Sequence, residues 1–355
     1  MYLCFAPMDW ITNCATRLIT KQIFEKYWDP DDSLGLRTEF MNVDGFLINP
    51  NQVIKHALTT KWQKPILQIY WWKSETLIKA VEKIQNEYSS LFSWIELNTW
   101  CPSNTVMKVW WWSDMLKDKE KTLNIIQKLS KIEGTLPFSI KTRTWINDND
   151  KNEQMNFLIK ASLFCTKISI HWRTLKQLYS WEADWNFIYE VKENIKKFWN
   201  SDCQIIGNWW INSYTDAKDK ISKYNLDWVM IGQASIWNPW VFTTYIPSSN
   251  EKCNIILKHL NYSIVCDDWF NEKIANKSGN INIQDLEIPF DWIEEHCRNN
   301  EKKLNFQPHT IVEFRKFLFQ YVKWISWSKE WKQMILSCKN YLELKNYIIT
   351  FFEWK

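Results

Sequence analysis

Side chains that can transfer protons or hold charge follow a series of short apolar runs in this sequence. In chain order the runs end at Pro7 and Met8, Thr38 and Glu39, Gln68, Asn98 with Cys101 just beyond, Lys141 and Arg143, His171 and Arg173, Asn208, and Gly232. Among these types, a cysteine thiol has an ordinary pKa of about 8.5. It is therefore protonated at neutral pH and can give up its proton in a closed site. The series predicts a polar site assembled from many separate strand ends.

The runs themselves are rich in β-forming residues and occur eight times before residue 240. They cover residues 3–8, 36–40, 65–70, 94–98, 137–143, 167–172, 203–208 and 227–232. Amphipathic stretches lie between most of them, at residues 75–88, 121–132, 185–198 and 214–224. This alternation predicts an α/β fold, a (β/α)8 TIM barrel whose sheet is buried on both faces. Active sites of such barrels lie at the C-terminal ends of the strands, so the polar strand ends are expected to meet at one mouth.

The alternation stops after residues 238–242, where a stretch rich in Pro, Ser and Asn leads into helix-like segments. We predict a catalytic barrel domain at residues 1–245 and a smaller, all-helical domain at 246–355. The polar, irregular stretch 267–310 is interpreted as an insertion. Residues 298–339 hold nine basic and three acidic side chains, a local charge of +6. That charge fits an ordinary solvated helix face as well as a surface that follows phosphates.

Composition narrows the class of protein. A chain of 355 residues, 46% of them hydrophobic, can bury a sizeable core. Nine Cys, an odd number with no C-x-x-C pair, speak against a disulfide framework or a structural zinc site. The net charge of +4 is too small to indicate a nucleic-acid partner by itself. With no leader-like segment and no apolar stretch of about 18 residues, we expect a cytoplasmic protein without membrane contact or metal.

Tryptophan stands where a backbone needs glycine. The chain has 26 Trp and 6 Gly, whereas ordinary usage gives roughly 25 Gly at this length. Trp71-Trp72 and Trp209-Trp210 each follow a strand-like run at a point where a turn calls for glycine. Our hypothesis is that most of these residues are glycines in the native protein, because a UGA codon has been read as Trp. A Trp-rich binding surface is the alternative, but it does not explain the missing glycines.

With glycine restored, the strand ends read APMDG, ELNTGCPS, KTRTG, IHGRT, GNGGI and MIGQASIGNPW. In this form the chain resembles the tRNA-dihydrouridine synthase family over nearly all of residues 3–242. The resemblance implies an FMN-containing barrel, a helical domain that binds tRNA, and NADPH as the reductant of the flavin. FRKFLFQYVKWISWSKE resembles the family's helical-domain signature. Five Trp residues fall on family glycines, whereas Trp185 and Trp240 resemble true tryptophans. The five are Trp100, Trp172, Trp209, Trp210 and Trp237.

The resemblance assigns chemistry to single residues. Cys101 is expected to be the general acid that protonates C5 of uracil while reduced flavin delivers hydride to C6. Residues expected to contact the cofactor are Pro7, Met8, Asp9, Gln68, Lys141, His171, Asn208, Trp209, Trp210, Gly232 and Gln233, the last five in two phosphate-binding turns. The family often has Ala at the position of Asp9 and Arg at that of Gln233, so the chain departs from the family at those two contacts.

Three residues are expected at the substrate, and two of them, Asn98 and Arg173, keep more than one interpretation. Asn98 fits either a contact to the uracil edge or flavin, or a turn held by its own backbone. Arg143 fits substrate binding, and Arg173 fits either an RNA phosphate contact or a salt bridge that braces the mouth. Two rival functions also stay open. They are a flavin barrel that acts on a free pyrimidine, similar to dihydroorotate dehydrogenase, and a tRNA-binding protein without catalysis. We expect a monomer.

Overall fold

The structure is a computed structural model that describes residues 1–99, 115, 118–144, 150–171, 185–198, 202–277, 281–299, 308–322 and 329–353. Within these ranges one parallel sheet runs in the order β2-β1-β9-β8-β7-β6-β5-β4-β3. Its strands are β1 (Tyr2–Phe5), β2 (Ser33–Gly35), β3 (Arg37–Asn42), β4 (Ile66–Tyr70), β5 (Ile95–Asn98), β6 (Phe138–Arg143), β7 (Lys167–His171), β8 (Gln204–Asn208) and β9 (Trp228–Ile231). All eight predicted strands are present, with ends shifted by at most a few residues.

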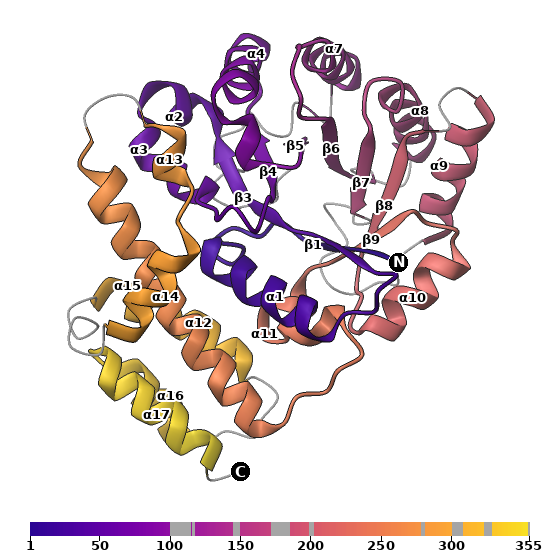
Figure 1. Cartoon of the computed structure of the whole chain (residues 1–355). Coiled ribbons are helices and arrows are strands. Elements are labelled where there is room, and N and C mark those ends of the chain that lie inside the picture. Colours follow the sequence, from indigo (N-terminus) through magenta and orange to yellow (C-terminus); the bar gives the residue numbers. More distant parts are fainter. Residues whose placement is uncertain are drawn as a thin grey trace.

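The sheet closes into a barrel because β2 and β3 act as one interrupted strand. Only Leu36 separates them, and it is itself buried. On one side Cys4 of β1 pairs with Gly35, and on the other side Arg37 pairs with Ile66 of β4. The ring of eight strands is therefore continuous, and the predicted TIM barrel is confirmed (Figure 1).

Helices surround the barrel, each placed after a strand (Figure 1). They are α1 (Cys14–Tyr27), α2 (Val43–Ile48), α3 (Pro50–Val53), α4 (Ser74–Lys83), α7 (Lys119–Ser130), α8 (Lys151–Ala161), α9 (Trp185–Phe198), α10 (Tyr214–Lys223) and α11 (Gln233–Trp237). Single 3-10 or π turns occur at Ile54–Ala57, Ile84–Tyr88, Ser89–Leu91, Pro239–Phe242 and Asn271–Ala275. Side-chain caps fix where several helices begin. Asn13 accepts from the Thr16 amide at the start of α1, and Ser213 does the same for Asp216 in α10.

Alternate residues of each strand face either the helices or the barrel interior. On β1, Leu3 and Phe5 belong to the large core under the helices, while Cys4 belongs to a small interior cluster. Another part of the interior is charged, because Arg37 and Glu96 are both fully buried there as an ion pair. This pair lies below the C-terminal ends of β3 and β5, where the predicted site is expected.

The C-terminal helices are α12 (Ser249–Phe270), α13 (Ile283–Leu286), α14 (Phe290–Asn299), α15 (Pro308–Tyr321), α16 (Lys329–Ser337) and α17 (Tyr341–Glu353). They lie together beside the barrel (Figure 1). Helix α12 packs on α1 of the barrel and also on α15 and α17. Its Tyr262 and Val265 belong to the barrel core, whereas Ile256 and Leu260 belong to a separate core with α15, α16 and α17. The predicted domain boundary at residue 245 stays a prediction.

The stretch that the sequence analysis interpreted as an insertion, residues 267–310, contains the end of α12 together with α13 and α14. It is tied to the barrel by backbone hydrogen bonds on both sides of Thr59, which donates to Leu286 and accepts from Ile288. The Tyr88 hydroxyl also donates to the Ile281 carbonyl at 2.7 Å. Its interpretation as an insertion stays a prediction. Among the described helices, none is long and apolar enough to cross a membrane.

Candidate active site

A cavity of about 380 Å³ opens at the C-terminal ends of the barrel strands. Twelve of the predicted site residues line it, namely Pro7, Met8, Gln68, Asn98, Lys141, Arg143, His171, Asn208, Trp209, Trp210, Gly232 and Gln233. Cys101 and Arg173 lie outside the described residues. Asp9 is not among the described residues that line the cavity. The strand ends therefore meet at one mouth, as the barrel topology requires.

Strand register explains why the polar wall of the cavity forms. Asn98 on β5 pairs with Lys141 on β6, and Arg143 at the end of β6 pairs with His171 on β7. His171 in turn pairs with Asn208 on β8. Lys141 and Arg143 are two residues apart and so point to the same side of the sheet. Two cations and an imidazole are thereby fixed on rigid strands beside one cavity, which suits a ligand that carries or develops negative charge.

The floor beneath this wall is a buried ion pair. The Arg37 guanidinium donates from Nε to Glu96 Oε1 at 2.8 Å and from Nη2 to Oε2 at 2.9 Å. The Ser169 hydroxyl donates to Glu96 Oε2 at 2.9 Å. Burial alone would raise the pKa of Glu96, but the charge and hydrogen bonds of Arg37, the Lys141 charge and the Ser169 hydrogen bond together outweigh burial and lower that pKa. Glu96 is therefore held as a carboxylate inside the barrel.

Two amides connect this floor to the cavity. Gln68 is fully buried and donates from Nε2 to Glu96 Oε1 at 2.7 Å. Asn98 Nδ2 lies 3.4 Å from Gln68 Oε1 and donates to it. A continuous chain of hydrogen bonds thus runs from Arg37 through Glu96 and Gln68 to the cavity wall.

The turn after β8 is built by two tryptophans. Trp209 is buried, and its ring lies 5.2 Å from the ring of His171, tilted by 39°. Trp210 is 55% exposed and has a φ of 29°, in the left-handed region that favours glycine. Asn208 before them is held by its side chain, which donates to the Met230 carbonyl at 2.8 Å. The indole of Trp209 therefore takes up room in the cavity beside His171.

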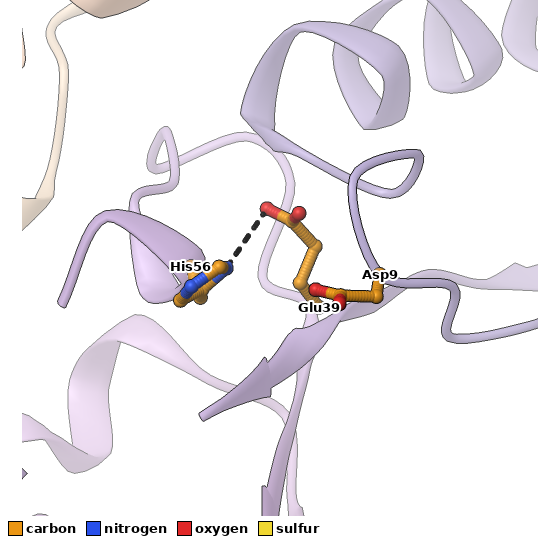
Figure 2. A group of neighbouring side chains, drawn as sticks. All are labelled: Asp9, Glu39 and His56. Atoms are coloured by element: carbon orange, nitrogen blue, oxygen red, sulfur yellow. Dashed lines mark ion pairs between the residues drawn. The ribbon is translucent and has the colours of Figure 1, made fainter. Parts of the chain in front are cut away.

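Asp9 lies in a separate charged cluster with Glu39 and His56 (Figure 2). Glu39 Oε1 accepts from the backbone amide of Trp10 at 2.8 Å, and Oε2 lies 3.4 Å from His56 Nδ1. Burial disfavours the charged form of His56, but Glu39 outweighs it and raises the pKa of His56. Burial, then the nearby Glu39 charge, raises the pKa of Asp9.

The potential ligand atoms of Asp9, Glu39 and His56 all lie within 4.8 Å of one another. Two carboxylates and one imidazole are a donor set that suits several divalent metals. In this arrangement, however, each Glu39 oxygen already meets a positively polarised partner within the protein. The cluster is therefore interpreted as an internal ion pair that fixes the loop after β1.

The comparison with known families decides which kind of barrel this is. A family model described as dihydrouridine synthase (Dus) matches residues 4–352. The chain belongs to the dihydrouridine synthase family. The match extends into α17 and so covers both the barrel and the C-terminal helices.

Individual relatives of this dihydrouridine synthase family member match the chain over shorter segments. A protein of Coprinopsis cinerea named tRNA-dihydrouridine(47) synthase, NAD(P)(+), is 27% identical over 217 residues, 56% of this chain and 31% of that protein. A protein of the same name from Candida albicans is 28% identical over 245 residues, 63% of this chain and 39% of that protein. Pasteurella multocida tRNA-dihydrouridine synthase B is 30% identical over 205 residues, 55% of this chain and 59% of that protein. The chain thus spans less than two thirds of the length of these relatives.

Sequence reasoning did not find the floor of the site in this dihydrouridine synthase family member. Arg37 and Glu96 each sit inside a predicted strand that was expected to be buried on both faces. A charged residue in such a strand indicates an internal ion pair, because a buried charge requires a buried partner. This was the signal in the sequence that could have revealed the floor. Seven cavity-lining residues were also missed. They are Ala6, Ile11, Phe40, Ile211, Asn212, Ala234 and Ile236.

Proposed function

We propose that this chain is a flavin-dependent enzyme that reduces the C5=C6 bond of a uridine in tRNA. One observation carries the proposal. In a member of the dihydrouridine synthase family, Lys141, His171 and Gln68 converge on a cavity at the C-terminal mouth of a TIM barrel. Relatives of the chain bear the name tRNA-dihydrouridine synthase, which supports tRNA as the substrate.

The residues around the cavity fit FMN as the cofactor. Lys141 would offer a fixed cation, Gln68 a carboxamide and His171 an imidazole to the ring system, and the backbone of Pro7 and Met8 would pack beside it. A bound flavin would supply the hydride, and NADPH would restore its reduced form. The turns at Asn208 and at Gly232-Gln233 line the same cavity and are proposed to hold the phosphate.

The protein's own part in the reaction is to orient the uracil and to supply a proton. Cys101 is proposed to donate that proton to C5, since a thiol is protonated at neutral pH. Asn98 and Arg143 are proposed to hold the substrate, and Arg173 is proposed to act at the rim. The uridine must leave its stack to reach the cavity, because a stacked base cannot expose C5 and C6.

The active form is proposed to carry glycine at most Trp positions, among them Trp10, Trp209 and Trp210. Two observations support this. Trp10 and Trp210 have φ values of 64° and 29°, and both side chains are more than half exposed. By contrast Trp185 is buried and packs on Gly207. A Cβ added at Gly207 would lie only 2.7 Å from the Trp185 ring. Trp185, expected to be a true tryptophan, thus packs in the core, while Trp10 and Trp210 occupy backbone that suits glycine.

The helical region is proposed to grip the tRNA through phosphates, mainly with its basic stretch 298–339. Lys316 on α15 supports this, because its ammonium lies 4.8 Å from the Trp10 ring, next to the loop that borders the cavity. We further propose that the chain acts as a monomer and without a metal ion.

The test is to compare substrates with flavin-loaded, full-length protein. The proposal predicts NADPH oxidation that depends on unmodified tRNA and is lost in Cys101→Ala. Equal rates with free uridine or dihydroorotate would favour the rival reading of an enzyme for small pyrimidines. Failure of the protein to take up flavin, with tRNA binding retained, would favour the non-catalytic interpretation.

A further inference from the structure

We propose that Glu96 is a positioning residue which turns the Gln68 carboxamide so that its oxygen faces the cavity. The cavity then selects a ligand edge that carries a ring imide N–H. This inference rests on the proposed function, because the two ligands of that reaction, flavin and uracil, both carry such an edge. Glu96 itself does not line the cavity and acts only through Gln68.

The orientation of Gln68 follows from the charge on its neighbour. An ionised carboxylate can only accept hydrogen bonds, whereas an amide end can either donate or accept. Gln68 approaches Glu96 Oε1 to 2.7 Å, a distance typical of a charge-assisted hydrogen bond. Turning the amide over would place two oxygens in contact with no hydrogen between them. The Gln68 nitrogen therefore faces the floor, and the oxygen faces the cavity.

Asn98 agrees with this orientation. Its Nδ2 donates toward Gln68 Oε1, which would be repulsive if the amide of Gln68 were reversed. A carbonyl oxygen has two lone pairs, so the long 3.4 Å contact to Asn98 does not saturate it. One acceptor position on Gln68 is thus available to a ligand in the cavity.

The Arg37 and Ser169 side chains keep Glu96 in place. Both Glu96 oxygens accept from Arg37, and Oε2 also accepts from Ser169. The donors come from β3 and β7, and Glu96 itself comes from β5, so the arrangement is fixed by three strands of the barrel. Replacing Glu96 with glutamine would remove the preference for one orientation of Gln68, because a glutamine amide can present either its oxygen or its nitrogen to Gln68.

The experiment measures discrimination between ligands rather than turnover. FMN and N3-methyl-FMN, which lacks the imide N–H, are titrated into full-length apoprotein carrying Trp209→Gly and Trp210→Gly, and binding is followed by flavin fluorescence. We expect FMN to bind about tenfold or more tightly than N3-methyl-FMN, since one hydrogen bond is lost and its acceptor is left unpaired. The same pair of titrations is run with uridine and 3-methyluridine by calorimetry.

Two variants and a matched control test whether the discrimination between the ligands depends on Glu96. Glu96→Gln is expected to reduce the ratio of the two dissociation constants toward one. Because it leaves Arg37 buried without its partner, the double variant Arg37→Met/Glu96→Met is measured as well, which removes both charges. Ser169→Ala also removes a hydrogen bond to Glu96 but leaves the contact with Gln68, so it should keep the wild-type ratio.

Each outcome is decisive. Discrimination in only one ligand pair, lost in the Glu96 variants, supports the inference and assigns the acceptor to flavin or to uracil. Equal binding of methylated and unmethylated ligands in both pairs overturns it, as does discrimination that survives in the double variant. Failure of the parent protein to bind FMN at all would instead refute the proposed flavin function and the inference with it.

Discussion

Replacing Trp210 with glycine should stabilise the protein relative to the same replacement at Trp28. Both indoles are about half exposed, 55% for Trp210 and 47% for Trp28. Each has an aromatic neighbour among the described residues with ring centroids 6.2 Å apart, Trp209 and Phe24 respectively. The two sites differ in backbone conformation, because φ is 29° at Trp210 and -70° at Trp28.

The magnitude follows from that difference. A residue with a Cβ in the left-handed region costs about 1–2 kcal/mol relative to the right-handed region. Glycine does not incur this cost, but it gives the unfolded chain more freedom, which costs about 0.5–1 kcal/mol at either site. The added freedom of the unfolded chain and the loss of one ring contact occur at both sites, so they cancel when the two variants are compared. Trp210→Gly should therefore be about 1–2 kcal/mol more stable than Trp28→Gly.

The assay is urea unfolding followed by far-ultraviolet circular dichroism, with free energies extrapolated to water for both variants and the parent chain. Equal m-values are required, so that the comparison reflects stability alone. Equal destabilisation by the two replacements would refute the argument that position 210 is built for glycine.

Four further predictions concern titration and the cavity. Glu39→Gln should lower the pKa of His56, which NMR measures. In the parent chain the Glu39–His56 pair stabilises the fold fully below about pH 6.5, and this stabilisation is lost as pH rises through the raised pKa of His56. Burial lowers the pKa of His259 to about 3, so only the unfolded chain takes up this proton as pH falls below about 6.5. Below about pH 6.5 the free energy of unfolding should therefore decrease by up to about 1.4 kcal/mol for each unit by which pH falls, and His259→Gln should remove this dependence. Trp209→Gly should strengthen FMN binding by emptying the space beside His171, and Lys141→Met should weaken it; unchanged affinities in fluorescence titrations would contradict both.

The barrel was predictable because its strands carry strong local signals. Strands buried on both faces read as continuous apolar runs, and amphipathic helices separate them. Helix α9 begins and ends at the predicted residues, 185 and 198. Strand β2 was missed because Ser33–Gly35 is too short for a pattern to show. Helix α12 was not separately predicted since it is buried against two cores and therefore lacks one apolar face.

The candidate site was predictable to the extent that topology alone decides it. Residues at the strand ends must meet in a barrel, so Lys141, His171 and Asn208 could be placed together from the sequence. The pairing of Arg37 with Glu96 could not, because it joins residues 59 positions apart whose contact depends on barrel closure. The separation of Asp9 from the cavity likewise follows from its approach to Glu39 on another strand.

The measurement that tests the central claim most directly is nucleoside analysis of tRNA. Unmodified tRNA is incubated with the flavin-loaded protein and NADPH, digested to nucleosides, and examined by mass spectrometry. The account predicts a nucleoside heavier than uridine by two hydrogen atoms, formed only when both flavin and NADPH are present. Unchanged uridine in tRNA, with a protein that is folded and binds flavin, would contradict it.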